Sequence, residues 1–456
     1  MTVRLYDTRA RAKVDLEPRD TGRLSIYVCG PTVYDVPHIG HGRTVLVYDV
    51  IRRYLRWRGF DVTFVSNVTD IEDKIIARAQ ETGATEPQLA RRFEAAYWGQ
   101  VDRLGVERPD RTPHATEYVG AMLDRIAELV DDGHAYVVPD RGVYFDVPSY
   151  ADYGALPHQQ LDQLLESAGA RVEVDDAKRH PVDFALWKAA KPGEPAWDSP
   201  WGPGRPGWHI ECSTMALDLL GDGFDVHGAG DDLVFPHNEN ERAQAEAAGH
   251  PYARYWLHSG MVEVGGEKMA KSLGNFRTLA DALDVHGPRA FRLAVLQTHY
   301  RKATDLADAE LAAAGHAVGR LDALARRATT FGVATDSAPD LETVGRFRAE
   351  MDDDFGTPGA LAAIFDAVGR ANRAIEADDV TGAASLVAAV RELSEALGIT
   401  IDTGTGSDAE IDARLEDRDA ARARGDFATA DRIRTELAEQ GIVLEDTPGG
   451  TVWHRR

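Results

Sequence analysis

The chain has 456 residues, which allows about three domains and a large core, and it carries a net charge of −24. That charge repels polyanions on average, so composition alone argues against a nucleic-acid partner unless basic side chains gather locally. The sequence has no apolar run of the length of a membrane span or of a signal-peptide core, so we expect a cytoplasmic protein without a membrane partner.

The first part of the chain predicts a parallel α/β sheet. Strands are expected at 24–28 and 60–65, with an amphipathic helix over 42–58 between them. A strand, helix and strand of this length give parallel strands joined by a right-handed crossover. Helical periodicity returns at 86–104 and 117–131. We therefore expect a doubly wound, Rossmann-type catalytic domain to begin here.

The middle of the chain interrupts this pattern. From Gly133 to about Gly207 the sequence is mixed and rich in Pro, Gly and Trp, which indicates an inserted connective subdomain built from hairpins. The α/β pattern then resumes with a strand at 224–227 and a helix at 240–248. Two halves separated by an insertion would meet over one crevice, which is where such sheets bind ligands.

The last third of the chain is helical. Ala, Leu, Glu, Asp and Arg recur at helical spacing over 305–397, which predicts a bundle. Glycines at 400–408 indicate a linker, and a helical hairpin with a short strand at 441–444 should follow. The expected parts are the catalytic domain in two halves at 1–115 and 208–260, the connective subdomain at 116–207, a lysine-loop and stem-contact region at 261–304, the helical bundle at 305–400 and a small C-terminal domain at 408–456.

Both cysteines of the chain, Cys29 and Cys212, fall where a loop would place them beside the expected crevice. A further segment holds His237 and Glu241, which a helix would place on one face. Two thiolates, an imidazole and a carboxylate form a suitable zinc set, since Zn²⁺ accepts S, N and O donors. Two lone cysteines are also often small buried hydrophobes, whereas a disulfide is disfavoured without an oxidising compartment.

A candidate nucleotide site is the motif His38-Ile39-Gly40-His41, at the entry to the helix that follows the first strand. The N-terminus of a helix offers unpaired N–H groups and a positive dipole to phosphate. The histidines would add donors, and Gly40 would let a nucleotide approach the backbone. Two histidines at this spacing are more often surface residues, but their place after a strand and a turn favours the functional interpretation.

A second candidate element is Lys268-Met269-Ala270-Lys271-Ser272, which holds two of the eight lysines of the chain. Flanking glycines indicate a mobile loop that can lay ammonium groups on a polyphosphate. Point charges on flexible stems suit a leaving pyrophosphate, whose charge grows as its bond breaks. Taken alone, two lysines are better explained by a solvated surface turn.

Together these segments resemble a known family. The histidine motif and the lysine motif are similar to the paired signatures of class I aminoacyl-tRNA synthetases. Further segments resemble the cysteinyl-tRNA synthetases in particular, at 27–35, 67–74, 206–212 and 235–241. The resemblance runs from Arg4 to Trp453 and favours the zinc interpretation of the cysteines.

The resemblance also implies site residues. One zinc ion per chain would be held by Cys29, Cys212, His237 and Glu241, and it would bind the sulfur of the substrate cysteine. A thiolate is a far better zinc ligand than a hydroxyl, so the metal would select cysteine over serine. The implied amino-acid pocket comprises Thr69, Trp208 and His227, with Asp232 close by in sequence. The implied catalytic residues are His38, His41, Lys268 and Lys271, and the implied nucleotide contacts are Gly40, Lys271 and Ser272.

The implied activity is that of a two-step ligase. The carboxylate of L-cysteine would attack the α-phosphate of ATP, with Mg²⁺, and give cysteinyl adenylate and pyrophosphate. The 3′ end of tRNA(Cys) would then take the aminoacyl group. The helical bundle and an anticodon-binding domain at the C-terminus would contact tRNA. There, Trp453 either stacks on an unpaired base or packs in a core. We expect a monomer.

Two other functions compete with this one. The first is a ligase that delivers cysteine to an amino-sugar acceptor in thiol biosynthesis, but such enzymes resemble only the catalytic half and lack the region after Thr400. The second is a zinc-stabilised RNA-binding protein without catalysis, and the intact histidine and lysine motifs argue against it.

The chain departs from the family pattern at three positions. Ala270 replaces the usual serine of the lysine loop, Asn238 stands where a second histidine is common, and Asp231 adds a carboxylate near His227 in sequence. None of these departures removes an expected metal ligand, so we expect them to affect rate and affinity rather than the identity of the activity.

Overall fold

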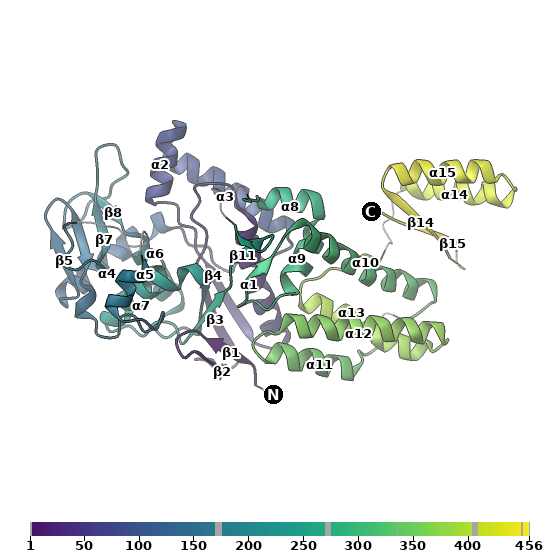
Figure 1. The fold of residues 1–456 in the computed structure, drawn as a ribbon, viewed down its shortest axis with the longest axis horizontal. Helices are drawn as coiled ribbons and strands as arrows, with labels where there is room; N and C mark the ends of the chain where they lie inside the picture. Colours follow the sequence, from purple (N-terminus) through teal and green to yellow (C-terminus); the bar gives the residue numbers. More distant parts are fainter. Residues whose placement is uncertain are drawn as a thin grey trace. The chain divides into compact units, whose positions relative to one another are not determined.

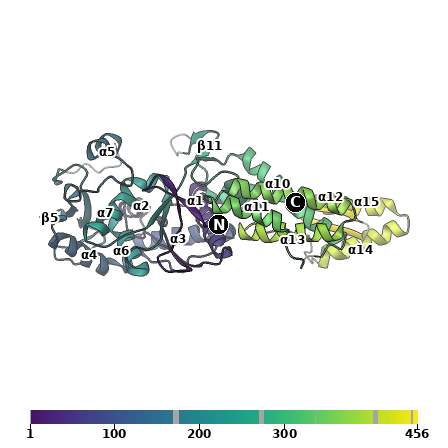
Figure 2. The same ribbon diagram turned by 90° about the horizontal axis from the view of Figure 1, so that it is seen from below.

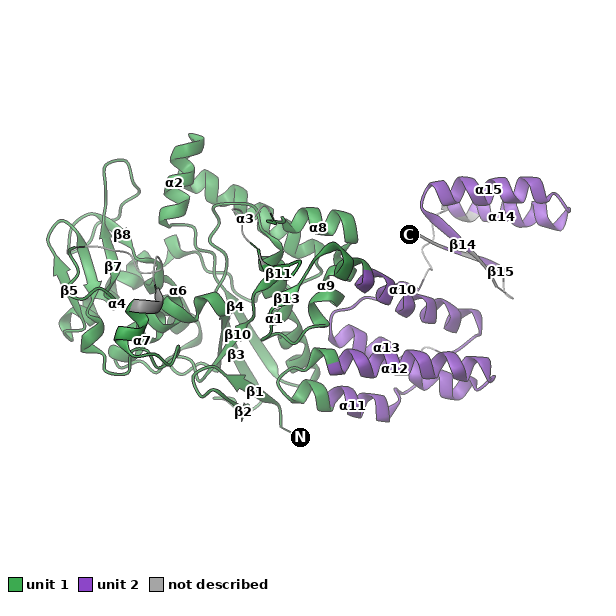
Figure 3. Ribbon diagram, viewed as in Figure 1, with its two compact units in different colours: residues 1–312, 349–358 green, residues 313–348, 359–456 purple. Residues whose placement is uncertain are grey.

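The structure is a computed structural model. It describes residues 2–168, 176–269, 275–334, 336–403, 409–447 and 450–455. The chain divides into two compact units (Figure 3). The first comprises residues 1–312 and 349–358, and the second comprises residues 313–348 and 359–456. Among the described helices, none combines the length and the apolar composition that a membrane-spanning helix requires.

A parallel sheet is the centre of the first unit. Its strands follow the order β10-β9-β3-β4 and are all parallel. They are β3 (Arg23–Val28), β4 (Asp61–Ser66), β9 (Val226–Gly230) and β10 (Tyr255–Ser259). The helices α1 (Ile39–Trp57), α6 (Trp208–Leu220) and α7 (Glu239–Ala247) connect them (Figure 1). The expected parallel α/β sheet is confirmed, and β10 is a strand that sequence patterning did not predict.

Helix α1 begins at Ile39, earlier than the residue 42 expected from periodicity. His38 is its N-cap: the Nδ1 atom of His38 accepts a hydrogen bond from Gly40 N at 3.1 Å, and Nδ1 of His41 accepts one from His38 N at 3.2 Å. Histidine is not among the usual N-cap residues, which explains why the helix start was misplaced. The histidine motif therefore forms the first turn of α1.

The inserted segment forms an antiparallel sheet with strand order β5-β6-β7-β8. Its strands are β5 (Ala135–Val138), β6 (Gly142–Phe145), β7 (Phe184–Ala189) and β8 (Gly204–Pro206), and the helices α2 (Asp73–Thr82), α3 (Glu86–Arg103), α4 (Val119–Asp131) and α5 (Leu161–Ala168) lie before or between them in the chain. Residues from β6, β7, α4 and α6 share one hydrophobic core. Of these elements, α4 and α6 lie close together in both views (Figures 1 and 2).

The connection from β8 to α6 positions a tryptophan. Gly207 donates its N–H to Leu186 O at 2.8 Å, and a Cβ at Gly207 would lie 1.9 Å from Ala185 O. Only glycine fits this approach of the two backbones. Trp208 is then the first residue of α6 and partly exposed at the surface of the cleft described below.

The lysine motif begins at the end of β12, in a small sheet with strand order β12-β11-β13. Its strands are β11 (Val262–Val264), β12 (Glu267–Lys268) and β13 (Thr304–Asp305), and the helices α8 (Leu279–His286) and α9 (Pro288–Leu296) lie between β12 and β13 in the chain. A hairpin of β1 (Arg4–Asp7) and β2 (Ala12–Asp15) completes the strands of this unit among the described residues.

The second unit contains most of the expected helical bundle and the C-terminal piece. The bundle helices are α10 (Asp308–Thr330), α11 (Leu341–Asp352), α12 (Thr357–Glu376) and α13 (Val380–Ala396). The C-terminal piece comprises α14 (Ala409–Ala423), α15 (Phe427–Glu439), β14 (Ile442–Thr447) and β15 (Gly450–Arg455). The single strand expected near residue 441 is thus one arm of an antiparallel hairpin, β14 and β15.

Trp453 belongs to the core of this C-terminal piece. Its side chain is 8% exposed and packs in one cluster with Ile411, Leu415, Ile433 and Leu437. On the neighbouring strand it is paired with Leu444. Of the two alternatives for this residue, the structure favours core packing over stacking on a base.

Candidate active site and metal centre

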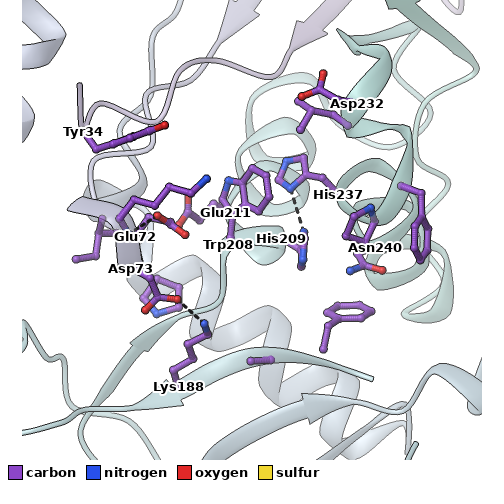
Figure 4. Close-up of a pocket in the computed structure, with 18 of the residues that line it drawn as sticks. Tyr34, Glu72, Asp73, Lys188, Trp208, His209, Glu211, Asp232, His237 and Asn240 are labelled. Atoms are coloured by element: carbon purple, nitrogen blue, oxygen red, sulfur yellow. Dashed lines mark hydrogen bonds and ion pairs between the residues drawn. The ribbon is translucent and has the colours of Figure 1, made fainter. Parts of the chain in front are cut away.

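A cleft opens beyond the carboxyl ends of the parallel strands, as expected for this fold. It has a larger cavity of about 770 Å³ and a smaller one of about 320 Å³. The two cavities share lining residues, so they are parts of one cleft, and Figure 4 shows the larger one. Shared residues include Tyr34, His38, Gly40, Trp208 and Asp232.

The four predicted metal ligands converge at the base of this cleft. Cys29 follows β3, Cys212 lies on α6, His237 precedes α7, and Glu241 lies on α7. One donor atom from each lies within 4.8 Å of all the others. Donors around tetrahedral Zn²⁺ lie about 3.3 to 3.8 Å apart, because their bonds are about 2.0 to 2.3 Å long. Among the described residues, this group has the size and donor chemistry of a zinc site.

Three neighbours outside the predicted ligand set hold the Glu241 carboxylate. Its Oε2 atom accepts a hydrogen bond from Tyr252 Oη at 2.9 Å and lies 2.8 Å from His227 Nε2, while Oε1 accepts one from Asn238 Nδ2 at 2.8 Å. Burial alone would raise the pKa of Glu241, but His227 and His237 outweigh it and lower that pKa to about 2. The carboxylate is therefore ionised, as a metal ligand must be.

The two thiols form a pair. Burial raises the pKa of Cys29 well above its ordinary value, whereas the hydrogen bond from Cys29 lowers the pKa of Cys212 to about 6. Cys212 is buried, while Cys29 is partly exposed and lines the smaller cavity. A metal ion bound here would displace the proton of Cys29, because zinc is bound by thiolates.

His237 is fixed by two aromatic neighbours. Its ring stacks on Trp208 with centroids 4.1 Å apart, and its Nδ1 atom lies 3.0 Å from Nδ1 of His209 (Figure 4). The Nε2 atom of His237 faces the cluster and lies 3.0 Å from Glu241 Oε1. A partner on the second nitrogen is what orients a metal-binding imidazole.

His209 was not among the predicted site residues. Its signal was present, because it lies three residues before Cys212 and therefore on the same side of α6. Glu211 was also missed: it lines the cleft, and burial followed by the charge of Cys212 raises its pKa strongly. Tyr252 had no local signal, since it lies in a loop before β10.

The residues predicted for the amino-acid pocket divide into two groups. Trp208 and Asp232 line both cavities. Thr69 and His227 are fully buried behind the wall, where Thr69 Oγ1 donates to Glu211 Oε2 at 2.9 Å and His227 contacts Glu241. A contact of Thr69 or His227 with the substrate stays a prediction.

The histidine motif borders both cavities. The rings of His38 and His41 lie 3.9 Å apart, and Phe276 contacts His38 edge-on at 5.6 Å. Burial, and then the neighbouring His38, lower the pKa of His41 to about 3, so its ring is neutral at physiological pH. A Cβ on Gly40 would lie 2.8 Å from His38 Cε1, so glycine keeps this turn open.

The predicted lysine loop is only partly described. The backbone of Lys268 lies in β12, but its side chain, together with Lys271 and Ser272, lies outside the described residues. Met269 lines the larger cavity, and its Cε would lie 4.0 Å from a Cβ on Gly40. The stem of the loop therefore reaches the first turn of α1.

Three regions of the chain match known protein families. Residues 15–316 match the family model of the tRNA synthetases class I (C) catalytic domain. Residues 346–402 match the DALR domain, and residues 405–453 match the cysteinyl-tRNA ligase anticodon binding domain. The cysteine–tRNA ligase of Alkalilimnicola ehrlichii is 49% identical over 99% of both chains, and that of Halorhodospira halophila is 48% identical over 99% of both.

The chain belongs to the cysteine–tRNA ligase family. The family and the class of ligase expected from the sequence are thus confirmed. Solved class I synthetases share the fold of this family member. Mycobacterium tuberculosis methionyl-tRNA synthetase, in complex with methionyl-adenylate, superimposes with a TM-score of 0.61 at 18% identity, covering 83% of this chain and 90% of that one. Agrobacterium radiobacter K84 LeuRS, in a ternary complex with tRNA and LeuAMS, gives 0.62 at 12% identity and 84% coverage of both chains.

Proposed function

We propose that this protein is a zinc-dependent ligase that activates L-cysteine with ATP and transfers it to tRNA(Cys). The observation that carries the proposal is the convergence of Cys29, Cys212, His237 and Glu241 at the base of the cleft that the histidine motif borders. Relatives named cysteine–tRNA ligase match the whole chain, including the anticodon-binding region, which favours a tRNA acceptor over an amino sugar.

Zinc is the metal that the donor set favours, because two thiolates, an imidazole and a carboxylate suit it and redox chemistry is not required. When bound, zinc would accept the thiolate of the substrate as a further ligand. Cys29 and His237 line the cavities, whereas Cys212 and Glu241 lie behind them, so the open side of the cluster faces the cleft. Serine offers only a hydroxyl at this position, and alanine offers no ligand.

Activation needs positioning more than covalent help from the protein. The ring of His38, the neutral ring of His41 and the N–H groups of the first turn of α1 are placed to stabilise the phosphates of ATP. Lys268 and Lys271 would neutralise the β and γ phosphates together with Mg²⁺. Trp208, stacked on His237, would hold the substrate between the metal and the nucleotide.

The second step needs a path for the end of the tRNA. Three of the eight lysines of the chain line the larger cavity, together with Arg205. They are Lys74, Lys178 and Lys188, and they lie among the acidic side chains of the same cavity, which include Glu72, Asp73 and Asp232. Asp73 pairs with Lys188 at 2.7 Å and also with Arg205, so the wall is held in place (Figure 4). These side chains would guide the phosphates of the acceptor end. We further propose a monomer that acts in the cytoplasm.

The test couples metal analysis to amino-acid activation. Cys212→Ala should lose bound zinc and lower cysteine-dependent exchange of pyrophosphate with ATP by about 100-fold or more. Ser213→Ala removes a buried hydroxyl from the same helix and should retain both, since Ser213 donates within the helix and to Gln244. Full activity of a zinc-free Cys212→Ala protein would contradict the proposal.

A further inference from the structure

Arg43, two residues after the histidine motif, is almost completely buried and contacts four backbone carbonyls. Its Nη1 atom donates to Gly260 O and, at 2.5 Å, to Met261 O. Its Nη2 atom donates to Lys302 O and, at 3.1 Å, to Tyr300 O. One planar guanidinium therefore joins two chain segments that are far apart in sequence.

These two segments are the base of the lysine-loop region. Gly260 and Met261 lead from β10 into β11, and residues 300–302 lead into β13. The segments approach closely, because Gly260 N donates to Tyr300 O at 2.8 Å and a Cβ on Gly260 would lie 2.5 Å from Lys302 O. The guanidinium satisfies the carbonyls on both sides of this contact, and β11 then continues through β12 to Lys268.

The far side of the loop is also attached to the start of α1. Leu279 N donates to Pro37 O at 2.8 Å, and Ile39 N donates to Arg277 O at 3.3 Å. Met261 and Val262 line both cavities of the cleft. The turn that carries the histidines therefore contacts the chain on both sides of the lysine motif, and Arg43 makes the contact on the β11 side.

The charge of Arg43 has no acidic partner among the described residues. Burial lowers its pKa to about 10, so the group is still charged at physiological pH, and no carboxylate contributes to this shift. Other buried arginines of this unit do have carboxylate partners, as Arg292 has in Asp49 at 2.7 Å. A buried cation held only by carbonyl dipoles is costly and suggests a role beyond stability.

We propose that Arg43 is a positioning residue. It fixes the base of the lysine loop relative to the histidine motif, so that both elements contact the same triphosphate. Lysine cannot replace it, because a single ammonium group cannot reach carbonyls on both segments in the plane that the guanidinium fork spans. The inference rests on the proposed function, because the proposed function assigns the lysine loop to pyrophosphate release.

The experiment uses Arg43→Lys in the full-length zinc protein, with cysteine-dependent exchange of pyrophosphate with ATP as the assay. Displacing the loop by about 1 Å should lower kcat by about 100-fold, while the KM for cysteine and the zinc content change less than about twofold. Unchanged zinc content per chain separates this effect from partial unfolding, since an unfolded fraction would lower both apparent kcat and zinc content while leaving the KM unchanged.

Arg292→Lys is the matched control. Arg292 is equally buried, lies on α9, and donates to the carbonyls of Leu104 and Gly105 as well as to Asp49. It should lower the melting temperature without the loss in kcat. Wild-type kcat in Arg43→Lys would overturn the inference, as would a fall in kcat, cysteine affinity and melting temperature shared equally by both variants. A wild-type protein without cysteine-dependent exchange would instead contradict the proposed function.

Discussion

Replacing Tyr252 by phenylalanine removes one hydroxyl group from the surroundings of the metal centre. That hydroxyl donates to Glu241 Oε2 at 2.9 Å. The ring is 2% exposed and packs edge-on against Phe224 with centroids 5.1 Å apart, a contact that phenylalanine retains. The substitution therefore tests the hydrogen bond to the ligand rather than the packing of the core.

The size of the effect follows from two independent considerations. A hydrogen bond to a charged group contributes about 1.5 to 3 kcal/mol. Loss of a group that orients a metal ligand typically weakens metal binding by about 10- to 100-fold, which corresponds to about 1.4 to 2.7 kcal/mol. Since His227 still contacts the same carboxylate oxygen, we expect Tyr252→Phe to raise the zinc Kd by about 10- to 100-fold.

Competition with a chelator at fixed pH measures this Kd, and the KM for cysteine should rise with it. Tyr54→Phe is the matched control, because the Tyr54 hydroxyl is also buried and donates to a carboxylate, Asp352, at 2.6 Å. It should lower folding stability and leave zinc affinity unchanged. The assigned role of this hydrogen bond would be refuted by one result: Tyr252→Phe binds zinc as tightly as the wild type, while Glu241→Gln does not bind zinc.

Three further predictions concern other parts of the chain. The pKa of His41 is lowered to about 3, so below pH 6.5 only the unfolded chain takes up this proton, and folding stability decreases as the pH is lowered. Urea titrations at pH 7 and 5 should show a smaller loss of stability for His41→Gln than for the wild type. An equal loss in both proteins would exclude His41 as the source. Removing residues 409–456 should weaken tRNA binding, and with it tRNA charging, while cysteine-dependent exchange of pyrophosphate with ATP is retained. Unchanged tRNA affinity would contradict the role of this piece. Trp453→Ala should destabilise the C-terminal piece by about 3 to 5 kcal/mol, seen as faster proteolysis there, whereas an intact fold with weaker tRNA binding would restore the stacking role.

Local patterns were enough to find the main elements of the fold. The strands near 24–28 and 60–65, and the helices near 86–104 and 117–131, correspond to β3, β4, α3 and α4. Periodicity succeeds here because each element presents one apolar face to a core, which the order of residues alone reveals. The start of α1 was misplaced because its cap is a pair of histidines that interact through their side chains.

The sequence by itself determined which donors the site would contain, because both cysteines and the segments around His237 resemble a family whose members share them. Only the tertiary structure decided how those donors are held. Parallel strands joined by long crossovers bring loops that are distant in sequence to one edge of the sheet. The spacing of His209 to Cys212 places it on the same side of α6, but only the fold brings it to His237, as it brings Tyr252 from its loop to Glu241. Arg43 contacts a carbonyl 218 residues away in the chain, and no spacing within the sequence encodes a contact between residues so far apart.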